Sequence, residues 1–117
     1  MNYERLLDFI FDSSHVLLIA ESSMAAHAPP LGFLVLLLDL PDEVTGAPQG
    51  FVAYMAVEPH VWGKGIGRML LAQAEERARE HGLPTLVLMV TEENEAARAL
   101  YAQAGFVTER RLLAKTL

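Results

Sequence analysis

Apolar residues occur along the chain in short runs, and the spacing within the first run differs from the spacing in the next ones. The first run follows Asn2, which can cap a helix, and its apolar residues recur at helical spacing. They are Leu6, Leu7, Ile10 and Phe11. This spacing predicts a first helix that ends at Asp12-Ser13-Ser14.

Three runs of strand length follow, at Val16–Ala20, Phe33–Leu38 and Gly50–Val57. The second run does not alternate with polar residues, which indicates a strand buried on both faces or at a subunit interface. The segments between the runs hold prolines among polar and small residues, so we expect a loop at Glu21–Pro30 and a hairpin connection at Asp39–Gln49.

Helices and strands alternate in the second half of the chain. The pattern predicts a helix over Gly65–His81, which Gly82 and Pro84 then stop. The remaining elements are expected as a strand at Leu86–Val90, a helix at Asn94–Ala104 that Gly105 ends, and a strand at Val107–Leu117. This order predicts an α/β fold in which helices pack on a mixed sheet.

Composition narrows the class of protein. The 117 residues are 52% hydrophobic and 21% charged, which suits one packed domain over residues 1–117. The net charge of −6 argues against a general nucleic-acid binder. The absence of cysteine excludes a disulfide framework and a thiolate site, and the histidines show no metal-binding spacing, so no metal is expected. The N-terminus has no signal-peptide pattern and no apolar run approaches about 18 residues, so we expect a cytoplasmic protein without membrane contact.

The stretch from Gly50 to Gly67 carries the clearest chemical signal. Gly63, Gly65 and Gly67 alternate where a strand gives way to a helix. Such glycines let backbone N–H groups approach a ligand, and the helix start adds about half a positive charge. The turn therefore suits a phosphate or pyrophosphate, and the alternative is a tight turn that binds nothing. The sixth residue from Gly63 is Arg68, so the spacing differs from the dinucleotide-binding fingerprint.

Two motifs together resemble the GNAT family of acyl-CoA-dependent N-acyltransferases. The segment from Val57-Glu58-Pro59 to Trp62-Gly63-Lys64-Gly65-Ile66-Gly67 is similar to the family's [Q/R]-x-x-G-x-[G/A] motif, which commonly follows Val-x-Pro. The family's N-x-x-A-x-x-L-Y-x-x-x-G-F motif is matched at Asn94, Ala97, Leu100, Tyr101, Gly105 and Phe106. The resemblance covers roughly Phe33 to the C-terminus. It implies a mixed, mostly antiparallel central sheet flanked by helices, with two strands splayed to form the CoA cleft.

The resemblance also implies acetyl-CoA as co-substrate and gives each matching residue a role. The backbone of Met55, Ala56 and Val57 would pair with the pantetheine arm, and the N–H of Ala56 or Val57 would stabilise the oxyanion. Asn94 would contact the cofactor, and Tyr101 would be the catalytic residue that assists the departing thiolate. The pyrophosphate would be held by Gly63, Lys64, Gly65, Ile66, Gly67 and Arg68.

The implied reaction is transfer of the acetyl group to a primary amine, by direct attack in a ternary complex. The acceptor would be a small molecule or a peptide, and the acidic balance favours a cation such as a polyamine, an aminoglycoside-like amine or a lysine. The alternative is a catalytically weak CoA-binding or protein-interaction module on the same fold.

The chain departs from the family pattern at three points. Trp62 stands where the family usually has Gln or Arg, a side chain that supports the loop. Met89 stands where some members carry a glutamate base, so the base stays open among Glu21, Glu58, His60 and Glu92. The chain is also short, and we expect it to begin after the usual first strand and helix and to end near the sixth family strand. A homodimer through an exposed sheet edge, or through the apolar Phe33–Leu38 run, is therefore expected.

Overall fold

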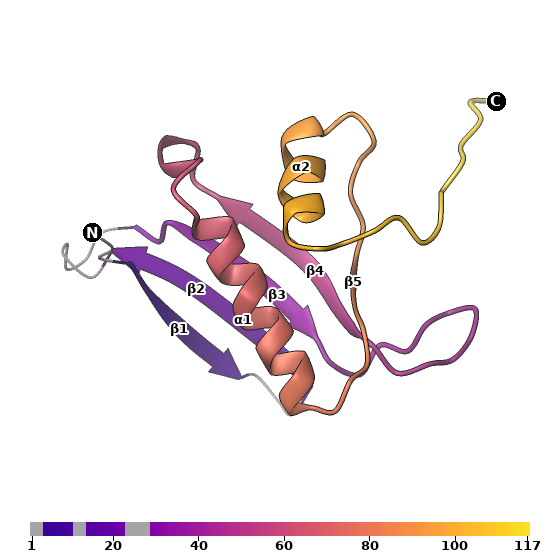
Figure 1. Ribbon diagram of the computed structural model, residues 1–117, viewed down its shortest axis with the longest axis horizontal. Helices are drawn as coiled ribbons and strands as arrows, with labels where there is room; N and C mark the ends of the chain where they lie inside the picture. Colours follow the sequence, from indigo (N-terminus) through magenta and orange to yellow (C-terminus); the bar gives the residue numbers. More distant parts are fainter. Residues whose placement is uncertain (1–3, 11–13, 23–28) are drawn as a thin grey trace.

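In the residues that it describes, a computed structural model of the chain has one five-stranded sheet and two α-helices (Figure 1). It describes the backbone of residues 4–10, and both backbone and side chains of residues 14–22 and 29–117. The strands lie side by side in chain order as β1 (Glu4–Ile10), β2 (His15–Ser22), β3 (Gly32–Leu37), β4 (Gly50–Val57) and β5 (Leu86–Leu88). Neighbours from β1 to β4 are antiparallel, and β5 is parallel to β4. The expected mixed, mostly antiparallel sheet is confirmed.

The first element is a strand, so the helix predicted after Asn2 is wrong over Glu4–Ile10. β1 pairs with β2 along its whole length, from Glu4 opposite Ser22 to Ile10 opposite Val16. A short apolar run fits a helix or a strand, and the ladder of backbone hydrogen bonds to β2 decides in favour of the strand. The predicted ends of that helix, and most of the Glu21–Pro30 loop, lie outside the described residues.

Strand β3 is buried on one face only, which corrects the expectation of burial on both faces. Leu34 and Leu36 are fully buried, whereas Phe33, which points to the other face, is 38% exposed. Burial therefore alternates along β3 although hydrophobicity does not, because the residues on the second face are apolar but are not fully buried.

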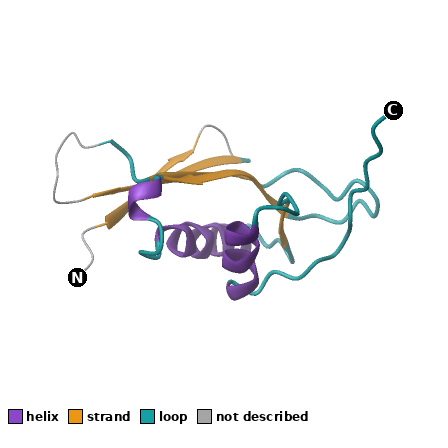
Figure 2. Cartoon of the chain, turned by 90° about the horizontal axis from the view of Figure 1, so that it is seen from above, coloured by secondary structure: helices purple, strands orange, loops and turns teal. Residues whose placement is uncertain are grey.

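Helices α1 (Ile66–Glu80) and α2 (Glu95–Gln103) lie on the same side of the sheet (Figure 2). Helix α1 packs across β2, β3 and β4, and the largest fully buried side chains at this contact are leucines. They are Leu18, Leu34, Leu36, Leu70 and Leu71. Among the described residues, neither helix combines the length and the apolarity that crossing a membrane requires.

Both helices end where the sequence predicts. Gly82 follows α1 with φ at 72°, and Gly105 follows α2 with φ at 94°. Both values lie in the left-handed region that favours glycine. The Phe106 N–H then donates to the Tyr101 carbonyl at 2.9 Å, which folds the chain back on the last turn of α2.

The C-terminal segment forms no strand, so the strand predicted at Val107–Leu117 is wrong. The segment runs away from the body of the molecule (Figure 1). Val107 and Leu112 are 86% and 94% exposed. A strand needs a neighbour, and β5 has only three residues to offer as one.

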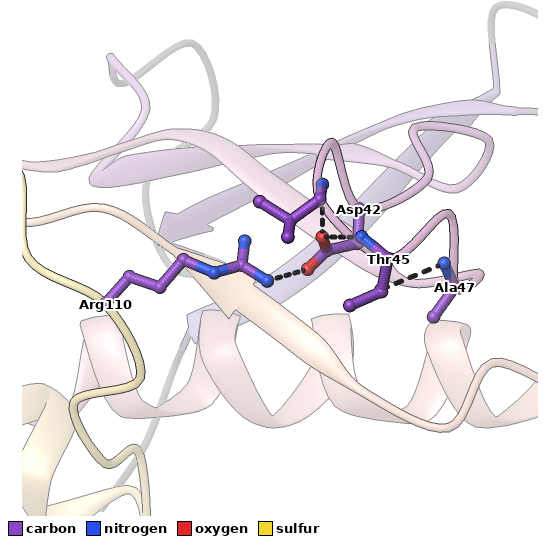
Figure 3. A network of polar contacts seen from close by, with 5 residues as sticks. Asp42, Thr45, Ala47 and Arg110 are labelled. Atoms are coloured by element: carbon purple, nitrogen blue, oxygen red, sulfur yellow. Dashed lines mark hydrogen bonds and ion pairs between the residues drawn. The ribbon is translucent and has the colours of Figure 1, made fainter.

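One polar network holds this segment to the connection between β3 and β4 (Figure 3). The Arg110 guanidinium donates to Asp42 Oδ2 at 2.7 Å. The other carboxylate oxygen of Asp42 accepts the N–H groups of Val44 at 2.7 Å and of Thr45 at 2.9 Å. These partners account for the burial of Asp42 in a loop that is otherwise mostly exposed.

Candidate functional site

A β-bulge changes the direction of strand β4 halfway along. Val35 of β3 lies opposite Tyr54, but the next residue, Leu36, lies opposite Val52. Ala53 is therefore an extra residue on β4, and beyond it the two faces of the strand are exchanged. Met55 packs against the core as a result, and Tyr54 is 71% exposed.

The bulge also decides which backbone groups of β4 stay unpaired. The Glu58 N–H donates to the Leu31 carbonyl of the segment entering β3, at 2.8 Å. The direction in which backbone N–H and C=O groups point alternates from one residue of a strand to the next. The backbone groups of Ala56 therefore also point to β3, whereas those of Met55 and Val57 point to the opposite edge of β4. On that edge β5 pairs only with residues 50–52. Beyond Val52 the two strands are no longer paired, as the expected splay of two neighbouring strands requires.

The glycine turn lies directly after this open edge and a short 3-10 helix, η1 (Pro59–Val61). Gly63 and Gly65 have φ at 81° and 85°, and a Cβ on either would meet no atom within 4 Å. The backbone conformation therefore requires glycine, and the space beside the turn is open. The first amide of α1 to bond along the helix is that of Met69, to the Gly65 carbonyl at 3.0 Å. The amides just before it have no partner within the helix, which fits the binding of a phosphate group.

Gly67 does a different job from the other two glycines. A Cβ on Gly67 would lie 3.0 Å from Leu100 Cδ2 of α2 and 3.8 Å from Val57 Cγ2 of β4. The absence of a side chain therefore lets α2 approach the start of α1. Arg68 adds a second tie between the helices, since its Nη2 donates to Gln103 Oε1 at 2.9 Å. Gly67 and Arg68 bring α2 to the glycine turn.

Helix α2 contributes the half-buried Tyr101. Its ring packs edge-on against Phe106, with 6.0 Å between the ring centroids. Burial raises the pKa of the Tyr101 hydroxyl above its ordinary value. At the other end of α2, Asn94 Oδ1 accepts the Ala97 N–H at 3.1 Å, which makes Asn94 the N-cap of the helix.

Trp62 has a partner that the sequence did not reveal. Its indole Nε1 donates to the Val57 carbonyl at 2.7 Å, although the side chain is 65% exposed. The indole has a single donor, and this bond joins the glycine turn to the last residue of β4. The one available signal was the position of Trp62, where the resemblance implied a side chain that supports the loop.

The four candidate bases lie on different segments of the chain. Glu92 Oε1 lies 3.9 Å from Arg98 Nη2 of α2, and His60 is exposed in η1. Glu58 lines a cavity beside Ala56, and Glu21 lies on β2. In the part of the chain that the structure describes, no cluster of His, Asp and Glu could hold a metal ion.

Comparisons with known proteins agree with this geometry. The model of the Acetyltransferase (GNAT) family matches residues 2–106. A mycothiol acetyltransferase from Thermobifida fusca is 41% identical over 61 residues, which are 52% of this chain and 19% of that protein. The chain spans about a fifth of the length of the curated relatives of this kind that it matches.

Solved structures show the same fold. A putative acetyl transferase from Pyrococcus furiosus has a TM-score of 0.77 and 25% identity, covering 91% of this chain and 68% of its own. The aminoglycoside N-acetyltransferase AAC(6')-Iy, in complex with CoA, has a TM-score of 0.75 over 91% of this chain and 78% of its own. At 19% identity this second likeness shows the fold alone.

Proposed function

Because the chain belongs to the GNAT family of acetyltransferases, we propose that it transfers an acetyl group from acetyl-CoA to a primary amine by direct attack in a ternary complex. One observation carries the proposal. Beyond residue 52, no described strand pairs with the edge of β4 that carries Met55 and Val57, and on this edge the Val57 carbonyl accepts from Trp62. The edge leads into a glycine turn with open space beside it. An extended strand of amides followed by a phosphate-binding turn matches the pantetheine and pyrophosphate parts of a CoA thioester.

The residues present fit this co-substrate. The amides of Gly63 and of residues 65–68 would hold the pyrophosphate, since the Lys64 N–H already donates to the Val61 carbonyl at 3.4 Å. On the edge of β4, the backbone of Met55 and the Val57 N–H would pair with the pantetheine arm, because the Val57 carbonyl accepts from Trp62. When bound, acetyl-CoA supplies an acetyl group activated as a thioester. The Val57 N–H faces the open edge and can stabilise an oxyanion there, whereas the Ala56 N–H faces β3. The alternation along the strand therefore favours Val57 over Ala56 for this role.

Tyr101 would donate a proton or a hydrogen bond to the leaving thiolate. A tyrosine hydroxyl is protonated at neutral pH, and because burial raises the pKa of Tyr101 further, a hydrogen bond to the thiolate is favoured over full proton transfer. Asn94 would act mainly through the helix, since its side-chain oxygen already caps α2.

The acceptor we propose is a cationic amine. The net charge of −6 favours the approach of a cation. One structural neighbour, an aminoglycoside acetyltransferase from a soil metagenomic sample, was solved in complex with sisomicin. That neighbour shares 14% identity with this chain, so it supports an amine acceptor without naming one.

The test is acetyl transfer to a panel of primary amines, followed as release of free CoA thiol. The wild-type chain should turn over, and Tyr101→Phe should lower kcat by roughly tenfold to a hundredfold while the Kd for acetyl-CoA stays unchanged. Binding of acetyl-CoA without turnover on any amine would contradict catalysis and leave a CoA-binding module.

A further inference from the structure

We propose that a cavity at the end of β4 receives the acceptor amine and that the Glu58 carboxylate holds its ammonium group, which passes one proton to this carboxylate or to water before the neutral nitrogen attacks the thioester. The cavity measures about 230 Å³. It is lined by Pro29, Pro30, Gly32, Phe33, Ala56 and Glu58. The inference rests on the proposed function, because it concerns the second substrate of the same reaction.

The cavity lies on the face of the sheet that α1 and α2 leave uncovered. Phe33 and Ala56 are Cα partners across β3 and β4, and they point away from the buried Leu34. In Figure 2, both helices lie against the other face of the sheet. An amine can therefore enter the cavity without passing between the helices and the sheet.

Ala56 connects this cavity with the proposed acyl site. Its side chain lines the cavity, while its neighbours Met55 and Val57 present their backbone groups along the open edge of β4. An acyl group held on that edge and an amine held in the cavity would approach the same end of β4 from two sides. This arrangement separates the entry of the two substrates, and attack within a ternary complex then requires the amine nitrogen to come within about 3–3.5 Å of the acyl carbon.

The chemistry of the lining selects an ammonium group on a carbon stem. Among the lining residues that the structure describes, Glu58 is the only charged one, and the others offer proline, phenyl and methyl surfaces. The Glu58 backbone is fixed by its bond to Leu31, and its side chain makes no hydrogen bond or ion pair within the described residues. A carboxylate beside apolar walls binds the charge of an alkylammonium and covers its carbon atoms at once.

The volume limits the size of the group that enters. A cavity of 230 Å³ equals about seven or eight waters at roughly 30 Å³ each. Pockets that enclose drug-sized ligands hold roughly 300–1,000 Å³. The cavity therefore takes a primary aminoalkyl group, either as a small amine or as the end of a larger molecule whose remainder stays outside.

The direct test is an NMR titration with 1,5-diaminopentane, which needs no acetyl-CoA. The amide signals of Phe33 and Ala56 should shift in the wild-type chain. Glu58→Gln should weaken the binding about threefold to tenfold, because it removes one charged partner at a partly exposed site. The matched control is Asp39→Asn, which removes the same charge from an exposed position after the far end of β3 and should bind as the wild type does. Unchanged binding by Glu58→Gln, or shifts that avoid Phe33 and Ala56, would overturn the inference.

Turnover separates this inference from the proposed function. Glu58→Gln should raise KM for 1,5-diaminopentane and leave KM unchanged for aniline, which is uncharged at neutral pH. An equal rise for both amines would contradict recognition of the ammonium charge. A wild-type chain that binds the diamine at Phe33 and Ala56 but does not bind acetyl-CoA would contradict the proposed function and leave the amine site standing.

Discussion

The indole N–H of Trp62 donates to the backbone carbonyl of Val57 at 2.7 Å. This bond spans five residues and joins the last residue of β4 to the start of the glycine turn. It links the two parts of the proposed acyl-CoA site, so the distance between the open strand edge and the phosphate-binding amides depends on it. A tryptophan here can do by one hydrogen bond what a polar side chain does in the family motif.

We predict that Trp62→Phe weakens acetyl-CoA binding by about twofold to tenfold, the worth of one hydrogen bond. The phenyl ring keeps most of the apolar surface but has no donor for the Val57 carbonyl. Trp62→Gln should bind more tightly than Trp62→Phe, because its amide can donate to the same carbonyl. Isothermal titration calorimetry measures both variants, and equal affinity in Trp62→Phe and the wild type would refute the role of this bond.

Gly65→Ala should lose both stability and ligand binding. The left-handed φ of 85° costs an L-residue roughly 1–2 kcal/mol, and the added methyl points into the open space beside the turn. Gly46 is the matched control, since it has a φ of 73° and the same open surroundings but lies in the connection between β3 and β4. Both variants should melt at lower temperature, and only Gly65→Ala should also lose affinity for acetyl-CoA. A similar loss of affinity in Gly46→Ala would contradict a specific role of the turn.

Gly32→Ala should destabilise the sheet beside the site. A Cβ on Gly32 would lie 2.8 Å from the Ala56 carbonyl oxygen and 3.3 Å from Val57 Cα, so β3 and β4 would have to separate. We expect a loss of about 1–3 kcal/mol in the free energy of unfolding, measured by urea denaturation. A variant as stable as the wild type would show that the two strands tolerate the wider spacing.

The stability of the chain should fall in acid partly through Asp42. The N–H of Thr45, the Arg110 guanidinium and the N–H of Val44 lower the pKa of this carboxyl from 3.8 to about 2. A lowered pKa in the folded state means that the ionised group stabilises the fold above pH 3.8 and that this contribution is lost as the pH falls through about 2. The free energy of unfolding should therefore drop more steeply between pH 5 and pH 2, measured at roughly 25 °C, in the wild type than in Asp42→Asn.

The control for this prediction is again Asp39→Asn, an exposed carboxylate three residues earlier in the chain. Its pH profile should follow that of the wild type. Parallel profiles for the wild type and Asp42→Asn would mean that the network in Figure 3 adds nothing to stability.

The two helices of the second half could be predicted from the sequence because specific residues mark their ends, whereas the strand predicted at Val107–Leu117 was wrong. Gly82 and Gly105 adopt the left-handed conformations that end helices, and Asn94 offers the oxygen that caps α2. The first element could not be predicted in the same way. The apolar positions within residues 4–10 fit both the spacing of a helix and the spacing of a strand, and only pairing with β2 makes the segment a strand.

The motifs located the candidate site, but its working parts are backbone groups. The extra residue at Ala53 decides which amides of β4 face the open edge. No residue type in the sequence marks the position of such a bulge. The cavity beside Glu58 likewise needs Pro29 and Phe33 to meet the end of β4 across two elements. Neither relation exists before the strands are paired, so both had to come from the structure.

The acyl-CoA site is best tested by the melting temperature of the chain with acetyl-CoA, free CoA and ATP. A ligand at about 100 times its Kd adds roughly 2.7 kcal/mol, which corresponds to a shift of about 10 °C for a domain of this size. We predict a shift of that order with both CoA species and little with ATP. Both CoA species offer pantetheine to the edge of β4 and pyrophosphate to the glycine turn, whereas ATP has no pantetheine arm. The absence of a shift at millimolar acetyl-CoA would contradict the proposal that Met55–Val57 and the glycine turn form an acyl-CoA site.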